Sequence, residues 1–535
     1  MLHRSSFCVG LLLIPAASLI AQTSQSRRSP ARSTRAASAG TVAQVRAVVL
    51  PLDGVDADSL QTIISRDLAN GDRVQVVDQA QTLKSAAVVK AVVTPVGVKV
   101  SLLDPQSSIT RQERDFTLPV VPAKRDQAVV DSLNSAFDAR YAARQARLAR
   151  AEVLRDSVQA ELAKKPPRLR NDKAKKDYAD QVAQRQTMMR DAIAEIATVT
   201  EEGTRDEALR ANVQAAALAR DAYVRDSTAI ARRWALHGVS DEVEQWITGH
   251  RGISQTRVAY VSGGEVRIVD FDGANDHAVT RSGPGAKAMS PAWRRDGREI
   301  VYSEMTDAGT QIAIVDVATG KSRPVLATPR GLNITPIFSP DDKYVIYANG
   351  SETRTSLVEA RPDTAGSFKY LPINHAFDAD EPILSPDGSR IAYVSSRPKT
   401  PQIYSSNLDG SDERAEAPAP PKGRVYHTSP DWSPDGSMIA YQQQNGDFQV
   451  WLVNRGNHSV RRLTTKGENE DPTWAPDARH IALTSNRGGG KAIWILDIQS
   501  GRFRQLTASG DARLAAWSAA SSSPVPSVAE APVNK

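Results

Sequence analysis

The side chains best suited to chemistry in this 535-residue chain are acidic residues in two clusters. Asp378, Asp380 and Glu381 form the first cluster, and Glu470 and Asp471 form the second. Converging carboxylates can hold a hard cation or act as a general acid and base. Because each cluster lies just before a short apolar strand, strand-edge solvation or a polar rim round a channel mouth are simpler interpretations. We therefore expect no catalytic site at these acids.

Motifs for the common enzyme chemistries are absent from the sequence. It contains no Gly-x-Ser-x-Gly elbow, His-Glu-x-x-His motif, P-loop or dinucleotide fingerprint. Asp270–Gly273 resembles the start of a calcium loop but lacks the ligands that should follow, so it predicts a hairpin turn. His237 precedes Ser240-Asp241 at the start of a helix, and we predict a structural role in capping or in packing between domains. His375 and His427 fall in loops that could face a channel, where surface contact is favoured over metal binding. We predict no cofactor and no metal.

The first 21 residues are typical of a cleavable secretory signal. A short basic start at His3-Arg4 precedes an apolar run from Phe7 to Leu19. A membrane anchor is the alternative, but the run is short and Pro15 interrupts it. Cys8, the only cysteine, lies inside this segment, so the mature chain would have no thiol, disulfide or cysteine metal site. We expect an exported, soluble protein.

The formal charge of +6 is concentrated at the N-terminus. Residues 1–40 contain five arginines and no acid, so the remaining chain is nearly neutral at about +1. A global nucleic-acid-binding field is therefore not supported. Residues 22–43 are rich in Ser, Ala and Arg and poor in apolar side chains, which predicts a disordered tail.

Residues 44–122 predict a small α/β domain. "VRAVVLPL" and "RVQVVD" have the apolar runs of buried strands. The stretch between them, "DADSLQTIISRDLAN", is an amphipathic helix with Leu60, Ile63, Ile64 and Leu68 on one face. Further strands follow around a turn at Pro95–Gly97.

Residues 123–233 form a second, helical region in which Gly203 is the only glycine. Narrow apolar stripes with charged flanks are typical of a helical hairpin or short coiled coil. Pro166-Pro167 separates a first helix from an expected second and third, and residues 234–256 predict a connecting helix and linker. The stripe residues are Val130, Leu133, Phe137, Tyr141, Leu154, Val158 and Leu162 before the break, then Tyr178, Val182, Met189, Ile193, Ile196, Leu209, Val213 and Ala216.

From Arg257 one pattern recurs six times. Its large apolar position falls at intervals of 42 to 48 residues, which indicates one supersecondary unit per repeat. A proline and the large residue are expected to start a short innermost strand, Ser-Pro-Asp-Gly makes a turn, and three more strands follow. Four antiparallel strands per unit predict one propeller blade. The six positions are Trp293, Phe338, Leu384, Trp432, Trp474 and Trp517.

The two ends of this region complement each other. "RVAYVS" (257–262) is a second strand with no innermost strand before it, and "RLAAW" (513–517) is an innermost strand with no second strand after it. We therefore predict a closed six-bladed propeller over residues 257–518 whose ends share one blade, which hides the sheet edges. A disordered tail is expected at 519–535. The fold class is thus multidomain, with an all-β six-bladed propeller, an α/β domain and a helical insertion.

The segment from His237, "HGVSDEVEQWITGHRGISQTRVAYVSG", resembles the TolB family of the periplasmic Tol–Pal system, as do "DFDGAND" and "SPAWRRDG". "VVLPLDG" and "IISRDLANGDRVQVVD" are similar to the family's N-terminal domain, and the resemblance covers roughly three quarters of the chain. Two features depart from the family pattern. The helical region at 123–233 is an addition, and the turns at Arg294-Arg295, Asp342, Ala475 and Ala478 differ from Ser-Pro-Asp-Gly, which we interpret as tolerant turns.

The resemblance implies a periplasmic, non-enzymatic scaffold that links a Pal-like outer-membrane lipoprotein to inner-membrane Tol components such as a TolA-like protein. Such a scaffold serves envelope integrity and constriction during cell division. We expect a monomer. A propeller adaptor of another envelope complex and a channel-using enzyme or small-ligand receptor are the alternatives. In the family, Pal covers the channel face, which implies partner contacts at the loops of Asn333, His375, Asp380, Glu381, Tyr426 and Glu470.

The Pro-Pro break in the helical region is strongly basic. Between Arg140 and Lys176 there are 12 Lys/Arg against 4 Asp/Glu. A solvated loop is the plain interpretation, and an electrostatic contact with an anionic membrane surface is the sharper one. The residues that would make this contact are Lys164, Lys165, Arg168, Arg170, Lys173, Lys175 and Lys176.

Overall fold

The computed structural model describes residues 44–519 apart from short gaps at 53–56, 95, 120–126, 284, 327–329, 374–376, 399, 419–424 and 509. The signal and both tails predicted from the sequence lie outside these residues, except for Ala519. Among the helices that are described, none is long and apolar enough to cross a membrane.

The N-terminal domain is a five-stranded mixed sheet covered by helices. The sheet order is β2-β1-β3-β4-β5, with β1 parallel to β2 and β3 and the remaining pairs antiparallel. Ile64 and Leu68 of α1 (Ala57–Asn70) are fully buried, as the amphipathic pattern predicted. The other elements are β1 (Val45–Val49), β2 (Val74–Val76), η1 (Gln79–Lys84), β3 (Ala87–Thr94), β4 (Gly97–Leu103) and β5 (Thr110–Thr117).

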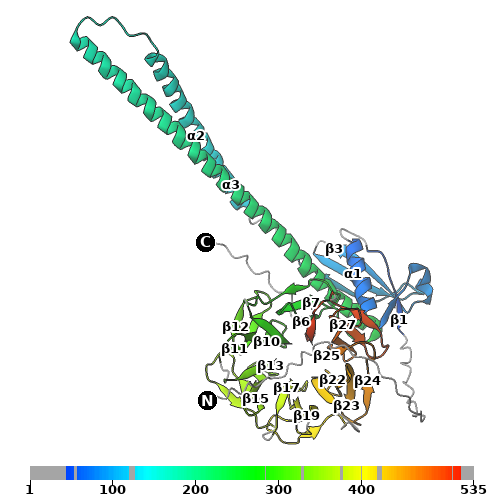
Figure 1. The fold of residues 1–535 in the computed structure, drawn as a ribbon. Helices are drawn as coiled ribbons and strands as arrows, with labels where there is room; N and C mark the ends of the chain where they lie inside the picture. Colours follow the sequence, from blue (N-terminus) through cyan, green and yellow to red (C-terminus); the bar gives the residue numbers. More distant parts are fainter. Residues whose placement is uncertain are drawn as a thin grey trace, which may run out of the picture. The chain divides into compact units, whose positions relative to one another are not determined.

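The helical region is a two-helix coiled coil made of α2 (Gln127–Leu162) and α3 (Asp172–Thr248), which lie side by side in Figure 1. The two helices expected after Pro166-Pro167 and the connecting helix are one continuous helix of 77 residues. Its last turns place Leu236, Val239 and Val243 in the core of the N-terminal domain. The arm and that core therefore share one helix, because α3 has no break where the sequence suggested a boundary.

The seam of the coiled coil differs from the expected stripe. In α2 the buried positions recur every seven residues at Phe137, Arg144, Ala151 and Val158, which is the heptad spacing of a coiled coil. Tyr141, Leu154 and Ile193, expected in the stripe, are 51%, 38% and 50% exposed. Phe137 and Val158 of the expected stripe do lie in the seam, whereas its other two positions are an arginine and an alanine, which a stripe of large apolar residues leaves out.

One ion pair, in which the arginine is buried and the aspartate is partly exposed, marks the register of the seam. The Arg144 guanidinium lies 2.8 Å from the Asp206 carboxylate on the facing helix. A Cβ at Gly203 would lie only 3.2 Å from Arg144 Nε, so the single glycine of this region gives the arginine room to cross. A polar pair at a seam position disfavours slipped registers, in which both charges would lose their partner.

Six four-stranded antiparallel sheets form the propeller, and their innermost strands contact one another in a closed ring. The shared blade has the order β29-β6-β7-β8, so the predicted closure of the first strands by the last one is confirmed. Its strands are β6 (Arg257–Ser262), β7 (Glu265–Asp270), β8 (His277–Ala278) and β29 (Arg513–Trp517).

In each of the other five blades, the four strands follow one another in sequence order from the channel outward, and each strand pairs only with its neighbours. Tyrosines from equivalent second-strand positions, Tyr302, Tyr347, Tyr393 and Tyr441, are almost completely buried between blades. The strands are β9 (Lys287–Trp293), β10 (Glu299–Thr306), β11 (Gly309–Asp316), β12 (Ser322–Pro324), β13 (Leu332–Phe338), β14 (Val345–Gly350), β15 (Thr355–Ala360), β16 (Phe368–Tyr370), β17 (Ala379–Leu384), β18 (Arg390–Ser395), β19 (Gln402–Asn407), β20 (Arg414–Ala415), β21 (Tyr426–Trp432), β22 (Met438–Asn445), β23 (Asp447–Asn454), β24 (Val460–Arg462), β25 (Asn469–Trp474), β26 (His480–Ser485), β27 (Ala492–Asp497) and β28 (Phe503–Gln505).

The innermost strands correct one detail of the sequence interpretation. The proline and the large residue do not start these strands. The proline lies inside the strand, and the large residue is its last residue. Each strand has a bulge, where the residue before the proline takes a positive φ of about 50°. Proline is tolerated there because a bulge interrupts the backbone hydrogen-bond ladder. The bulge residues are Ser290, Thr335, Glu381, Ser429, Asp471 and, with alanine in place of proline, Leu514.

Candidate functional site

One mouth of the propeller channel is acidic and is built by the bulges. Glu381 accepts a hydrogen bond from the backbone N–H of Ser429 in the next blade at 2.5 Å. Asp471 likewise accepts from the N–H of Leu514 at 3.2 Å. Asp431, which lines the cavity in the opposite part of the channel, accepts from the N–H of Trp474 at 2.6 Å. These carboxylates therefore fasten neighbouring blades together while they line the channel.

Burial gives these acids unusual protonation behaviour. It raises the pKa of Asp380 to about 7 and, with the nearby Asp380 charge, that of Glu381 to about 8. Burial also raises the pKa of Asp431 and Asp471 to about 6. The low-dielectric surroundings disfavour the charged carboxylates. Near neutral pH this mouth is thus less negative than its count of acids suggests.

The other predicted contact residues have different settings. Glu470 forms an ion pair with Lys491 at 2.8 Å, and Tyr426 is partly exposed at the start of β21. Asn333 is only 3% exposed, and its side-chain oxygen accepts from Asn349. His375 lies outside the described residues. Five of the six predicted positions thus fall near the starts of four innermost strands, from β13 to β25.

The opposite part of the channel is lined by large apolar side chains together with charged ones. The six repeat positions from Trp293 to Trp517 line a cavity of about 420 Å³ with Arg294, Arg295 and Asp342. Arg294 Nε lies 3.5 Å from Asp342 in the next blade. The turns that depart from Ser-Pro-Asp-Gly in these two blades thus compensate each other, which corrects the interpretation of merely tolerant turns.

A first buried charge cluster joins the N-terminal domain to the propeller. His237 Nδ1 lies 2.7 Å from Asp67 of α1, and His237 Nε2 lies 3.6 Å from Asp272 of the turn after β7. Arg66 and Arg233 also pair with Asp272. The predicted role of His237 in packing between domains is confirmed, but His237 lies well inside α3 and not at the start of a helix, which corrects that part of the prediction. The Asp270–Gly273 turn supplies one of its partners.

A second buried charge cluster surrounds the turn of the fifth repeat, which differs from the Ser-Pro-Asp-Gly consensus. His480 is fully buried between Asp477 at 2.8 Å and Asp72 of the N-terminal domain at 3.2 Å. Burial lowers the pKa of His480, but the two carboxylates outweigh that effect and raise it to about 9. Arg73 reaches across to Asp477 at 3.0 Å. His480 is therefore a charged imidazolium at neutral pH and donates to both carboxylates.

Both clusters bring His and Asp ligand atoms close enough to hold a metal ion. However, arginines already pair with the same carboxylates: Arg66 and Arg233 in the first cluster, Arg479 and Arg502 in the second. A divalent cation would have to displace these guanidinium groups or the imidazolium proton. The donor chemistry therefore favours a charge-balanced contact between domains.

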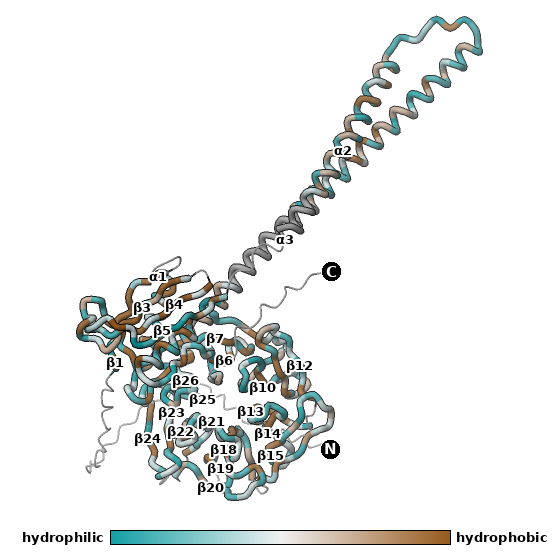
Figure 2. The backbone as a smooth tube through the Cα atoms, turned by 180° about the vertical axis from the view of Figure 1, so that it is seen from behind, coloured by the Kyte–Doolittle hydropathy of each residue, from teal (hydrophilic) through white to brown (hydrophobic). Residues whose placement is uncertain are grey.

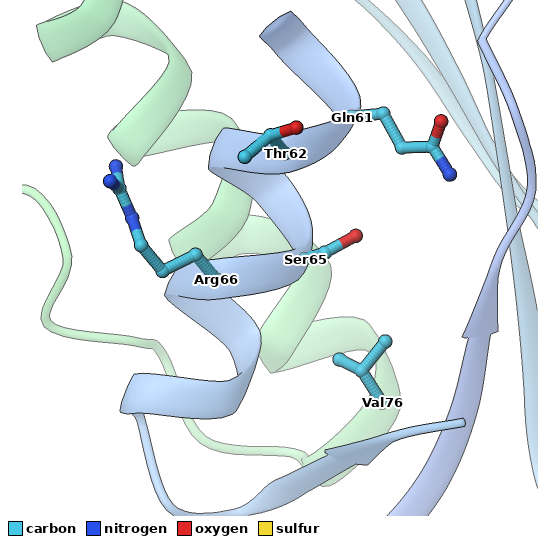
Figure 3. Close-up of a pocket in the computed structure, with 5 residues that line it drawn as sticks. All are labelled: Gln61, Thr62, Ser65, Arg66 and Val76. Carbon is cyan, nitrogen blue, oxygen red and sulfur yellow. The ribbon is translucent and has the colours of Figure 1, made fainter. Parts of the chain in front are cut away.

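A shallow depression on α1 offers little chemistry. It has a volume of about 630 Å³ and is lined by Gln61, Thr62, Ser65, Arg66 and Val76, as Figure 3 shows. Its polar groups are amides, hydroxyls and one guanidinium, without a general base or nucleophile activator.

The basic residues predicted for anionic-surface contact all lie at the end of the arm. They occupy the loop between α2 and α3 and the first turns of α3, and all seven are exposed. Figure 2 shows this loop as mainly hydrophilic. The structure thus places all seven residues at one end of the arm.

The comparisons with known proteins agree with this architecture. The family model of the TolB beta propeller domain matches residues 244–521. The Tol-Pal system protein TolB of Francisella tularensis subsp. tularensis (strain FSC 198) is 29% identical over 273 residues, 48% of this chain and 61% of that protein. Its counterpart from F. tularensis subsp. mediasiatica is 29% identical over 269 residues, with 48% and 60% covered. The chain thus spans about three fifths of the length of these curated relatives.

The crystal structure of TolB from Acinetobacter baumannii superposes with a TM-score of 0.61 at 18% identity, covering 90% of this chain and 98% of that one. This likeness extends the shared fold over the N-terminal domain and the propeller. The molecule is a β-propeller protein with an α/β domain bound to it through buried charges. It belongs to the TolB β-propeller family, as the sequence motifs predicted.

The second interdomain cluster was not predicted from the sequence, although a signal was present. The fifth repeat has "APDARH" where others have "SPDGSR" or "SPDGSM". Arg479 and His480 in that altered turn contact Asp72 of the N-terminal domain. In this blade the departure from the consensus turn coincides with contact to another domain.

Proposed function

We propose that this protein is a non-enzymatic scaffold of the periplasm that works in a Tol–Pal-type system. It would link a Pal-like lipoprotein of the outer membrane to inner-membrane Tol components such as a TolA-like protein, in support of envelope integrity and constriction during division. The single observation that supports this most is the family match across the propeller, together with an N-terminal domain fixed to it by buried charges.

The acidic channel mouth is the proposed partner-binding face. Asp380, Glu381 and Glu470 present carboxylates there beside the partly exposed Tyr426. A protein partner could donate hydrogen bonds to them and cover the aromatic ring, as tyrosine and its polar neighbours commonly do in interfaces. Asn333 would support this face from below, because its side chain is buried. His375, outside the described residues, stays part of the proposal through its place in the sequence shortly before β17.

Site-specific photocrosslinking tests this proposal. A photoreactive phenylalanine analogue would replace Tyr426 at the mouth, and in a matched control Tyr370, which is 52% exposed on the outer strand β16. Crosslinking in intact cells and identification of the captured proteins should give an envelope lipoprotein from position 426 and none from position 370. Capture of no envelope lipoprotein at 426, or equal capture at both positions, would count against this face as the binding site.

A further inference from the structure

The tip of the arm is a concentration of cations that the rest of the molecule does not neutralise. Lys164 pairs with Glu161 and Lys175 pairs with Asp172, each within one helix turn. Among the described residues, the remaining five form no ion pair within 4 Å; they are Lys165, Arg168, Arg170, Lys173 and Lys176. Farther along the arm, by contrast, Arg147 contacts both Glu195 and Glu202.

The coiled coil holds these cations on a defined platform. Asn171 caps α3 by accepting a hydrogen bond from the N–H of Ala174 at 2.8 Å, which fixes the start of the helix beneath the loop. From Asp172 to Leu236, where α3 enters the N-terminal core, the helix rises about 95 Å at about 1.5 Å per residue. The tip therefore has a defined structure where α3 begins.

From this geometry we propose that the arm tip binds the surface of an anionic phospholipid bilayer. The tip has exposed cations but only one large apolar residue, the partly buried Leu169. A stable protein interface normally needs a dehydrated apolar or aromatic centre, which this segment does not offer. Lipid headgroups instead present a diffuse plane of negative charge, to which each nearby lysine or arginine adds roughly a fivefold gain in binding.

This contact is distinct from the proposed scaffold function and does not depend on it. Without an inserted apolar anchor or lipid chain the binding should be weak and reversible. It should also weaken with added salt, because exposed charges are screened within about 8 Å at physiological ionic strength.

Cosedimentation of the purified protein with vesicles tests the proposal. The tip variant has glutamine at Lys164, Lys165, Arg168, Arg170, Lys173, Lys175 and Lys176. A control variant has the same change in net charge at seven exposed positions of the two domains: Lys84, Lys90, Arg281, Lys321, Lys343, Lys369 and Lys466. Glutamine keeps good helix propensity, so circular dichroism should give the same helix content for all three proteins.

We expect the unmodified protein and the control variant to bind phosphatidylglycerol vesicles and not phosphatidylcholine vesicles. The tip variant should bind phosphatidylglycerol vesicles at least 100-fold more weakly. Absence of binding by the unmodified protein, equal binding by the tip variant or equal loss in the control would overturn the proposal. Tighter binding to a DNA duplex than to the anionic vesicles would assign the tip to polyanions in general and would also overturn it.

Discussion

The propeller and the arm use charge in opposite ways. In the propeller, charged groups make contacts inside the folded protein: Asp431 accepts a hydrogen bond from the backbone of the next blade, and His480 lies between two carboxylates. In the arm, one ion pair, Arg144 with Asp206, sets the register, and the cations gather where the two helices end. A closed ring has an interior in which to bury ionic contacts, whereas a two-helix seam is too narrow to bury many. We therefore expect the propeller's charges to matter for stability and the arm's charges for contact with other surfaces.

The largest effect should follow from opening the ring. Deleting residues 513–535 removes β29, leaves the edge of β6 unpaired and exposes the buried face of the shared blade. We expect loss of the cooperative thermal unfolding of the propeller together with aggregation, because an exposed apolar edge strand pairs with other chains. Deleting only residues 520–535 is the control. A truncated protein that melts like this control would show that closure through β29 is dispensable.

A smaller but still large effect is expected at the interdomain contact. His480→Ala leaves Asp477 and Asp72 buried without their imidazolium, and breaking a buried pair in this way costs about 3–5 kcal/mol. We expect the N-terminal domain to become separately sensitive to proteolysis while the propeller stays folded. His458→Ala, at an exposed turn, is the control. Unchanged proteolysis of the N-terminal domain in the His480 variant would contradict the proposed importance of this cluster.

The same histidine predicts the direction of a pH effect. Its folded pKa of about 9 lies above the ordinary value of 6.5, so its stabilising contribution is complete below about pH 6.5. That contribution is lost as the pH rises towards 9. Urea unfolding at several pH values should show this loss, and His480→Ala should remove it. Stability that rises over this interval in the unmodified protein would be the wrong sign.

A moderate loss of stability is expected from a change in the arm. Gly203→Leu would drive a side chain into the space of Arg144 and disturb its pair with Asp206. Overpacking of this kind costs about 1–3 kcal/mol, although leucine favours helix more than glycine does. The control is Ala197→Leu on the exposed face of the same helix. We expect the helical signal to melt earlier only in the Gly203 variant, with propeller unfolding unchanged.

The last test concerns the acidic mouth. Glu381 has its folded pKa raised to about 8 by burial, so ionising it costs stability as the pH rises from about 4.5 through 8. Glu381→Gln removes this ionisation and still offers an oxygen to the Ser429 N–H. Unfolding measured against pH should therefore be flatter in the variant. An unchanged pH profile would show that Glu381 does not titrate in this range.

The sequence predicted the propeller in detail because its information is local. Each blade repeats a strand and turn pattern within 42 to 48 residues, and the mismatch at Arg257 and Trp517 is sufficient to infer the shared blade. Bulges were missed because an innermost proline fits both a strand start and a bulge. Of the coiled-coil seam, Phe137 and Val158 were predicted, but Arg144 and Ala151 were not, because a pattern of large apolar residues leaves out an arginine and an alanine.

The pairing within the second interdomain cluster could not be derived from the sequence for a different reason. Asp72 and His480 are about four hundred residues apart, and no periodicity relates them. Their pairing depends on how two separate domains pack, which is a tertiary property. The acids of the proposed partner face could be assigned to one channel mouth, because they occupy equivalent positions in the repeats. Their bonds to neighbouring blades required coordinates.

The continuity of α3 also has a mechanical consequence. One unbroken helix includes the cap at Asn171, the seam at Val199 and the core position Val243. An isolated helix of this length would bend, but its pairing with α2 stiffens the outer part and the domain core clamps the inner end. A sideways force applied at the tip would therefore reach the N-terminal domain as a torque, since no hinge lies between them. The arm is in that sense a lever, and its fulcrum is the packing of Leu236 and Val243 against the sheet.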